Sequence, residues 1–228
     1  MDEWDIAQHW SKVRAAVPAE VQVIAVSKTK PISAVETAYA AGARSFGENR
    51  VQELVGKHEA LTHPETGQLA DYPDLSWHQI GTLQKNKVKY IAPFVGLIHA
   101  VDQTSLLNEI DKRAAANGRK ISVLLQLHIA QESSKFGLSE SELTALLGDV
   151  DSGHWPHVEI KGLMGMATFT EDHIQVGREF QSLRKLYDQF RDPFGWDTLS
   201  MGMSGDWQIA VDNGSNMVRI GSSIFGHR

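Results

Sequence analysis

Two kinds of segment alternate along almost the whole chain, and this alternation constrains the fold more than any other feature. Apolar, β-branched runs of strand length, such as residues 21–29 and 121–129, alternate with segments such as 32–41, in which apolar residues recur at helical spacing. Such an alternation favours a parallel sheet with helical crossovers. The strand segments are continuously apolar, as parallel strands covered on both faces require.

Eight strand–helix units favour a closed barrel over an open sheet. The sequence therefore predicts a single α/β domain over residues 1–228, a TIM-type (β/α)8 barrel with an extra N-terminal helix. The predicted strands are residues 21–29, 43–47, 76–81, 96–101, 121–129, 160–167, 198–204 and the start of 217–225. The predicted helices are residues 2–17, 32–41, 48–61, 83–91, 104–117, 139–147, 171–191 and 206–212, with loops at 62–75 and 154–157.

The composition excludes several classes of function. The 228 residues include no cysteine, which excludes a disulfide framework and cysteine-ligated zinc. The formal net charge is −6 and no segment concentrates lysine and arginine, so we expect no nucleic-acid partner. No apolar run approaches the roughly 20 residues of a membrane span, and the acidic start lacks a signal-peptide pattern. We expect a cytoplasmic monomer with no membrane partner.

The ten histidines show no pattern of metal ligands. His154 and His157 flank Trp155 and Pro156 in a predicted loop, without carboxylates at ligand spacing, so we expect no metal site. The sequence also lacks a Gly-x-x-x-x-Gly-Lys phosphate loop, a His-Glu-x-x-His motif and a Gly-x-Ser-x-Gly motif. A functional site must therefore be sought in residues outside these common motifs.

Lys28 is the first of these residues. It ends an apolar strand, and in a barrel this position lies at the C-terminal mouth, where active sites are found. A lysine that is partly removed from water there favours its neutral form, which attacks aldehydes to give Schiff bases. The alternative is a lysine whose stem packs on the strand end while its ammonium group reaches solvent.

Two segments rich in glycine and serine follow the last two predicted strands. Residues 200–206 run from strand seven into a helix, and residues 219–223 run out of strand eight. The loops after these two strands frequently bind phosphate in barrels, because backbone N–H groups at a helix start favour anions. Tight turns are the alternative explanation for either segment alone.

Three further polar residues could belong to a site, and each has a structural alternative. Arg219 lies within a predicted strand, where a buried arginine needs an acceptor such as a core carboxylate. Asn49 begins a predicted helix and could simply cap it. His78 lies on a predicted strand and could be a core histidine with its hydrogen bonds satisfied.

Taken together, these segments resemble the pyridoxal phosphate homeostasis protein family. The matching stretches follow the family order over nearly the whole chain, and they are residues 25–31, 46–53, 77–87, 132–137, 162–164, 199–206 and 218–226. The resemblance implies a single barrel similar to the barrel domain of alanine racemase, the fold type III arrangement for binding pyridoxal 5'-phosphate.

The resemblance also implies roles for individual residues. Lys28 would form the Schiff base with pyridoxal 5'-phosphate, and Arg219 would face the pyridine nitrogen. Asn49 and His78 would line the pocket. The phosphate would be held by Ser204, Gly221 and Ser222.

The implied function is intracellular vitamin B6 homeostasis without an established reaction. Delivery of the cofactor to pyridoxal phosphate-dependent apo-enzymes is a plausible extension of this role. The chain departs from the family pattern at His128, where asparagine is usual, at Met166 and Ala167, which replace Ile-Pro, and at Gln79, where an apolar residue is usual. These departures concern local pocket contacts.

Two enzymatic alternatives remain open. The first is an amino-acid racemase related to alanine racemase, which would need a proton carrier on each face of the substrate. Three of the four tyrosines lie in predicted helices and the fourth, Tyr72, precedes a strand, so His78 is the remaining candidate for the second carrier. Because the sequence continues for only three residues after Phe225, we expect no second domain with a catalytic tyrosine. The second alternative is a barrel aldolase that uses Lys28 without a cofactor.

Overall fold

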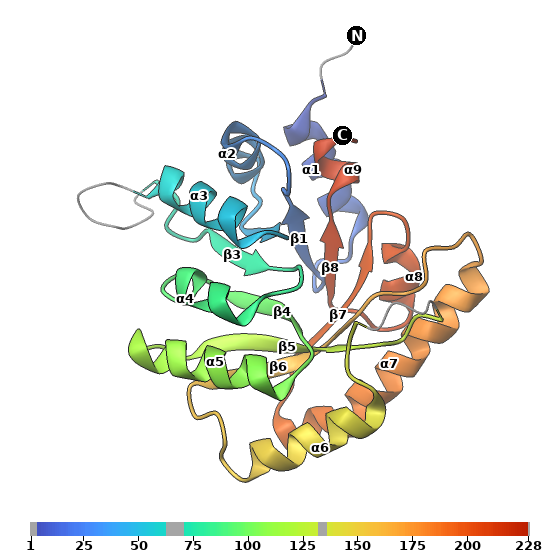
Figure 1. Ribbon diagram of the computed structural model, residues 1–228. Helices are drawn as coiled ribbons and strands as arrows, with labels where there is room; N and C mark the ends of the chain where they lie inside the picture. The colour runs from blue at the N-terminus through green and yellow to red at the C-terminus, as the bar shows by residue number, and fades with distance from the viewer. Residues whose placement is uncertain (1–3, 63–70, 132–135, 228) are drawn as a thin grey trace.

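Each strand pairs in parallel with its neighbours in the sequence, and the eighth strand pairs with the first. The computed structural model describes residues 4–62, 71–131 and 136–227, and within these ranges eight strands form the closed barrel of Figure 1. The predicted barrel is therefore confirmed. The strands are β1 (Gln22–Val26), β2 (Ser45–Glu48), β3 (Ser76–Gln79), β4 (Leu97–Val101), β5 (Ile121–Leu127), β6 (Val158–Gly165), β7 (Thr198–Met203) and β8 (Met217–Ile220).

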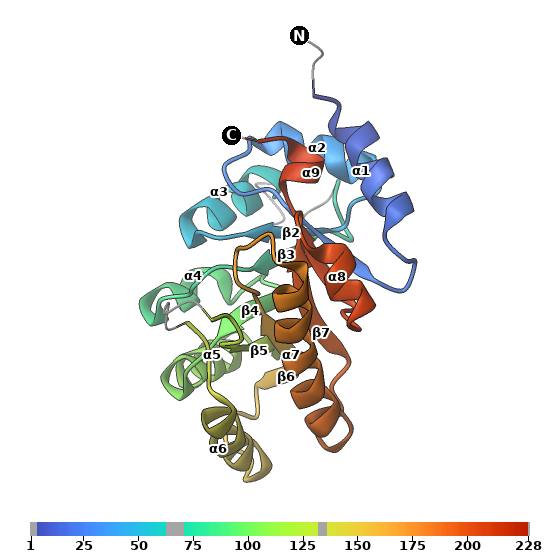
Figure 2. The same ribbon diagram turned by 90° about the vertical axis from the view of Figure 1, so that its right-hand side faces the viewer.

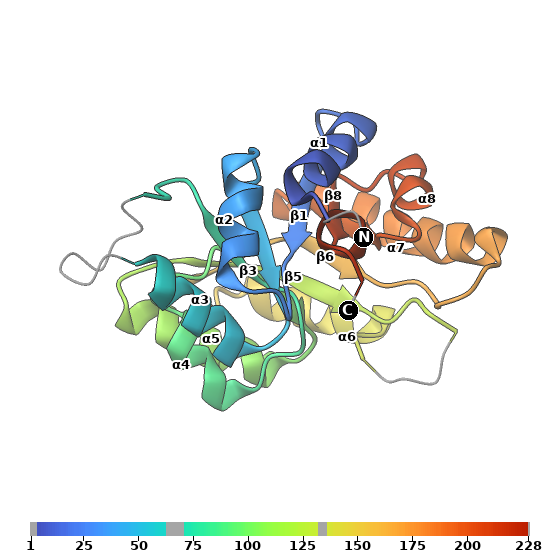
Figure 3. The same ribbon diagram turned by 90° about the horizontal axis from the view of Figure 1, so that it is seen from above.

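Helices surround the strands on the outside (Figure 3). The extra helix α1 packs against α2 and against the last helix, α9, so both ends of the described chain lie on one side of the barrel (Figure 2). None of the helices in the described ranges is long and apolar enough to cross a membrane. The helices are α1 (Ile6–Ala16), α2 (Ile32–Ala40), α3 (Val51–Leu61), α4 (Val88–Ile91), α5 (Thr104–Ala116), α6 (Glu140–Asp151), α7 (His173–Phe194), α8 (Trp207–Asp212) and α9 (Ser222–Phe225).

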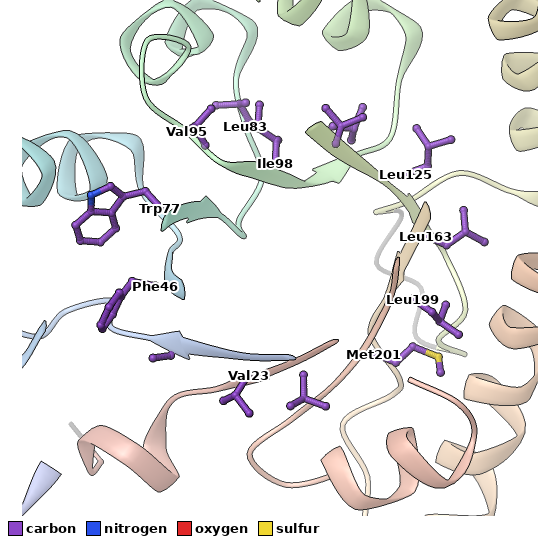
Figure 4. Close-up of a cluster of buried hydrophobic side chains, with 14 of the residues drawn as sticks. Val23, Phe46, Trp77, Leu83, Val95, Ile98, Leu125, Leu163, Leu199 and Met201 are labelled. Atoms are coloured by element: carbon purple, nitrogen blue, oxygen red, sulfur yellow. The ribbon is translucent and has the colours of Figure 1, made fainter. Parts of the chain in front are cut away.

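The core consists of two layers separated by the strands. In the outer layer, side chains such as Phe46, Trp77 and Leu163 point away from the barrel centre (Figure 4). Because successive side chains of a strand point to opposite faces, the neighbours of these residues point inward. The inner layer contains a small apolar cluster of Ile24, Leu97, Ala100, Leu124, Met164 and Met217.

Two strands are irregular near the barrel mouth. The register of β4 against β5 shifts between Ile98 and Val101, and that of β7 against β8 shifts between Ser200 and Met203. Such bulges insert an extra residue and redirect side chains, and they are common beside active sites. In β4 the shift allows two consecutive residues, His99 and Ala100, to belong to the inner layer.

Several predicted boundaries were wrong. The helix predicted over residues 83–91 is a short 3-10 turn, η1 (Lys85–Lys87), followed by the single turn of α4. Glu48, predicted to begin a helix, ends β2 instead. Helix α6 extends to Asp151, although its predicted capping box at Ser139 is confirmed. Residues 217–225 open with the eighth strand as predicted, and the one-turn helix α9 follows after Gly221. The errors arise at element ends, where hydrogen-bond partners outside the element decide the boundary.

Candidate functional site at the barrel mouth

The C-terminal ends of the strands surround a cavity of about 690 Å³. This volume lies within the usual range for small-molecule sites, roughly 300–1,000 Å³. The predicted site residues that line the cavity are Lys28, Asn49, Ser204, Arg219, Gly221 and Ser222. Met203 and Gly205, from the predicted segment 200–206, also line it. Further lining residues, not predicted individually, include Val26, Ile80, Gly81, Thr82, Ala100, Gln126, Phe136 and Phe169.

Lys28 lies in a tight turn directly after β1. The N–H group of Lys30 donates to the carbonyl oxygen of Ser27 at 3.0 Å, so Lys28 and Thr29 are the two central residues of the turn. Thr29 has a φ of 65°, which is rare for a β-branched residue. The lysine is half-buried and also lines a neighbouring cavity beside α9. The turn therefore places an amine at the edge of the mouth.

Arg219 projects from β8 into the barrel interior, with only 5% of its surface exposed. Its Nη1 donates to the carbonyl oxygen and the hydroxyl of Ser200, at 3.1 and 2.5 Å, and its Nη2 donates to the carbonyl oxygen of Gly165 at 3.1 Å. Among the described residues no carboxylate forms an ion pair with it. The alternative of a core ion pair therefore fails, because backbone and hydroxyl oxygens satisfy this arginine.

Burial lowers the pKa of Arg219 to about 10, and the nearby Asp206 acts in the opposite direction. The guanidinium group is still protonated at neutral pH, and it can only donate hydrogen bonds. We therefore expect any ligand atom in contact with the Arg219 guanidinium to be a hydrogen-bond acceptor.

The loops after β7 and β8 meet beside the cavity. The N–H group of Gly221 donates to the hydroxyl oxygen of Ser204 at 3.1 Å. A Cβ atom at Gly221 would lie 3.2 Å from the carbonyl oxygen of Val26, so the β8 loop runs close against β1. The carboxylate of Asp206 accepts a hydrogen bond from the N–H group of Met203 at 2.6 Å and closes the β7 loop. These two loops present hydroxyl and backbone donors of the kind that bind phosphate.

The backbone of Asn49 is held at the cavity by Gln79, the polar residue that stands where the family usually has an apolar one. Gln79 is fully buried, and its Nε2 donates to the carbonyl oxygens of Asn49 at 2.9 Å and of Gly81 at 3.1 Å. A Cβ atom at Gly81 would lie 2.7 Å from the Asn49 carbonyl oxygen, so only glycine allows this close approach. The departure at Gln79 thus stabilises the segment that carries Asn49.

His78, the remaining predicted site residue, is not among the residues that line the cavity. It is buried on β3, and its Nδ1 lies 2.9 Å from Nε2 of His99 on β4. Burial lowers the pKa of His78 to about 4 and the pKa of His99 well below its ordinary value. Both imidazoles are therefore neutral at pH 7. The structural alternative, a satisfied core histidine, describes His78 better.

The other departures from the family pattern lie in different surroundings. Met166 lines the mouth cavity, whereas Ala167 is buried beside it in the outer core. His128 is exposed and lines a separate cavity between α6 and α7. Residues 132–135 of the matching stretch 132–137 lie outside the described residues.

The four tyrosines lie away from the mouth cavity. Tyr39 and Tyr72 contact each other edge to face beside α2. Tyr90 is exposed on α4, and the hydroxyl of Tyr187 on α7 donates to the carbonyl oxygen of Trp196 at 3.2 Å. None of the four tyrosines lines the mouth cavity, in agreement with the positions predicted for them. Within the described ranges no three histidine or carboxylate side chains gather as metal ligands.

Comparison with known proteins gives consistent results at the level of sequence. Residues 2–228 match the family model described as the alanine racemase N-terminal domain. A pyridoxal phosphate homeostasis protein from Vibrio alginolyticus is 38% identical over 92% of this chain and 88% of its own length. The protein of the same name from Pseudomonas aeruginosa is 37% identical over 98% of this chain and 96% of its own.

Solved structures extend the comparison to the fold. PipY from Synechococcus elongatus, solved with pyridoxal phosphate bound, has a TM-score of 0.86 and 35% identity over 97% of this chain and 100% of its own. Alanine racemase from Bartonella henselae has a TM-score of 0.73 but 16% identity, over 98% of this chain and 58% of its own. The second likeness concerns the barrel fold alone.

Proposed function

The chain belongs to the alanine racemase N-terminal domain family and, within it, to the pyridoxal phosphate homeostasis proteins, and from this membership we propose that it binds pyridoxal 5'-phosphate at the barrel mouth and serves vitamin B6 homeostasis. One observation carries the proposal. A lysine amine, a buried protonated arginine and two loops of phosphate-binding type line a single cavity of suitable size.

Lys28 is the proposed attachment point. When bound, the cofactor would supply an aldehyde, and the neutral ε-amine of Lys28 would be the nucleophile that attaches it, with loss of water. The half-buried position of Lys28 beside the β8 loop supports this role, because the loop could hold the phosphate while the lysine reaches the aldehyde.

The phosphate is proposed to bind Ser204, Gly221 and Ser222. Because the N–H group of Gly221 donates to the hydroxyl of Ser204, the two loops are already drawn together. Arg219 would face the pyridine nitrogen, and this permanent hydrogen-bond donor would keep that nitrogen unprotonated. Asn49, which follows β2, also lines the cavity. An unprotonated ring is a poorer electron sink, which suits holding the cofactor better than carbanion chemistry.

The absence of turnover is part of the proposal. His78 is the remaining candidate for a second proton carrier, and its ring contacts that of His99 outside the cavity lining. Racemisation would therefore need a carrier other than the four tyrosines or His78. The alternative racemase function is supported only by the shared barrel fold.

Partners other than the cofactor belong to the same proposal. The side chains of Phe136, Met166, Phe169 and Met203 form a largely exposed apolar rim around the cavity. Exposed apolar patches often mark protein-interaction sites, which supports delivery of the cofactor to apo-enzymes. The monomeric state and the cytoplasmic location stay predictions.

The test is the absorption spectrum of purified protein with pyridoxal 5'-phosphate. We expect a visible band that disappears on borohydride reduction, and mass spectrometry should then locate the reduced adduct on Lys28. Lys28→Ala should lose the band and keep the circular dichroism spectrum of the folded barrel. Lys89→Ala, on the exposed surface of α4, is the matched control and should keep the band. An adduct found only on another lysine, such as Lys30, would overturn the assignment.

A further inference from the structure

Hydrogen bonds to strand β2 and helix α3 hold the turn that carries Lys28. Ser27, the residue before Lys28, is fully buried, and its hydroxyl donates to Oε1 of Glu48, at the end of β2, at 2.6 Å. Thr29, the residue after Lys28, donates its N–H group to Oε1 of Glu53 on α3 at 2.5 Å. Lys28 therefore lies between two residues whose hydrogen bonds lead away from the cavity.

Lys57 joins these contacts into one network. It lies on α3 and is 7% exposed. Its ammonium group donates to the carbonyl oxygen of Ser27 at 2.8 Å, to Oε1 of Glu48 at 2.7 Å and to Oε1 of Glu53 at 2.8 Å. An ammonium group has three hydrogens, so every one of them is engaged. The network ties β1, β2 and α3 together directly behind Lys28.

The network is poorly explained by stability alone. Glu48 is fully buried, and its Oε2 atom has no hydrogen-bond partner among the described residues. Burial raises the pKa of the Glu48 carboxyl, although Lys57 and Ser27 donate to it. A buried ion pair with an unsatisfied oxygen often contributes less stability than apolar residues of the same volume would. A role in fixing local geometry accounts for it better.

The backbone of the turn shows what is being fixed. Thr29 has a φ of 65°, in the left-handed region that β-branched residues avoid. Such a conformation costs free energy and persists where surrounding contacts impose it. The bond from Thr29 N–H to Glu53 and the bond from Lys57 to the Ser27 carbonyl are the contacts that impose it here.

We infer that Glu53 and Lys57 are positioning residues, which hold the turn of residues 27–30 so that the amine of Lys28 faces the cofactor. This inference rests on the proposed function, because it concerns the same site. It assigns a role to an ion-pair network that does not line the cavity and that the sequence analysis did not single out.

Glu53 is the residue to change. Its side chain is 23% exposed, so its removal leaves no buried charge without a partner, whereas removal of Lys57 would strand the carboxylate of Glu48. Glu53→Ala removes the acceptor of Thr29 N–H. Glu53→Gln keeps an Oε1 atom that can accept both from Thr29 and from Lys57, and serves as the conservative rescue.

The matched control is Glu109→Ala. Glu109 pairs with Arg113 in the same i,i+4 geometry at 2.6 Å, and its side chain is 22% exposed. The two alanine variants therefore lose comparable ion pairs, one behind the turn and one on α5, away from the mouth. A merely structural contribution would affect the melting temperature of both variants alike.

Two measurements follow the turn and the site separately. In cofactor-free protein, hydrogen exchange at the Thr29 amide should accelerate at least about tenfold in Glu53→Ala and stay unchanged in Glu53→Gln and Glu109→Ala. With pyridoxal 5'-phosphate added, covalent attachment to Lys28 should slow or weaken by about tenfold in Glu53→Ala alone.

The outcomes separate this inference from the proposed function. If wild-type protein forms the Lys28 adduct and Glu53→Ala behaves as Glu109→Ala does, the positioning role is wrong and the proposed function stands. Faster exchange without any loss of attachment also overturns the positioning role. If wild-type protein forms no adduct on Lys28, the proposed function fails, and the role of Glu53 in orienting a cofactor lysine fails with it.

Discussion

His78 and His99 share the barrel interior with Arg219, and the three side chains affect one another. The positive charge of Arg219 adds to burial and to the His78 interaction in lowering the pKa of His99. A second positive charge in this space is unfavourable, so the histidine pair stays neutral while the arginine stays charged. Among these three side chains only Arg219 carries a positive charge at neutral pH, and it lines the cavity, where a ligand could contact it.

This arrangement predicts a dependence of stability on pH. Both histidines have folded-state pKa values below the unfolded value of about 6.5, so the unfolded chain binds protons first and stability falls as pH drops below that value. With a folded pKa of about 4, His78 alone contributes a loss of about 2 kcal/mol between pH 7 and pH 5.

Urea unfolding at pH 7 and pH 5 measures this loss. The double variant His78→Gln/His99→Gln should show a shallower fall in the free energy of unfolding than wild-type protein. His173→Gln, an exposed control on α7, should keep the wild-type slope. Equal slopes in wild-type protein and the double variant would contradict the interpretation.

Residue types predicted most of the polar residues that line the candidate cavity, but not the residues that contact them from behind. Lys28 and the Ser204 and Gly221 loops could be predicted because strand ends and glycine-rich turns have recognisable patterns. His99 could not be assigned, because nothing in the sequence indicates that its ring on β4 meets that of His78 on β3. Glu53 and Lys57 lie on an ordinary amphipathic helix, and nothing in their spacing indicates which strand end they reach.

At the level of elements, the strands were easier to predict than the helices between them. Strands such as β1, β4 and β5 are dense apolar runs, so their existence depends little on their neighbours. The segment after β3 carries helix-forming residues, yet only η1 and the single turn of α4 form there. The loops that bring Phe136 and Phe169 to the cavity have no periodicity, so their contacts could not be read from the chain.

The paired loops after β7 and β8 predict discrimination between forms of the vitamin. Pyridoxal 5'-phosphate should bind at least about tenfold more tightly than pyridoxal, because charge-assisted hydrogen bonds contribute about 1.5–3 kcal/mol each and only the phosphate engages these loops. Ser204→Ala should reduce this ratio, while Thr82→Ala, at the rim on the other side of the cavity, should preserve it. Equal affinity of wild-type protein for both compounds, measured by calorimetry, would rule out the assignment.

For the molecule as a whole, the shared barrel does not imply a shared reaction. The alanine racemases that resemble it structurally are at most 16% identical among those compared, and this chain spans 57–60% of their length. The catalytic differences between such proteins lie in the side chains around the barrel mouth and not in the strands.

We accordingly predict no racemisation at an enzymatic rate. The rate at which L-alanine or L-serine loses its circular dichroism signal is measured with saturating cofactor. For wild-type protein this rate should equal that of Lys28→Ala, and it should lie far below the ordinary enzymatic range of roughly 1–1,000 turnovers per second. Turnover within that range, lost in His78→Ala, would place the protein among the racemases.

The short helix α9 connects the mouth to the far end of the chain. It begins directly after Gly221, and the indole nitrogen of Trp4 donates to the carbonyl oxygen of Ile224 within it at 2.7 Å. Ser222, the first residue of α9, is also one of the residues proposed to hold the phosphate, so the helix that Trp4 contacts adjoins the proposed anion site. If phosphate binding strengthens the Trp4 contact, that contact strengthens phosphate binding by the same free energy. The indole of Trp4 would then report on occupancy of the loop after β8.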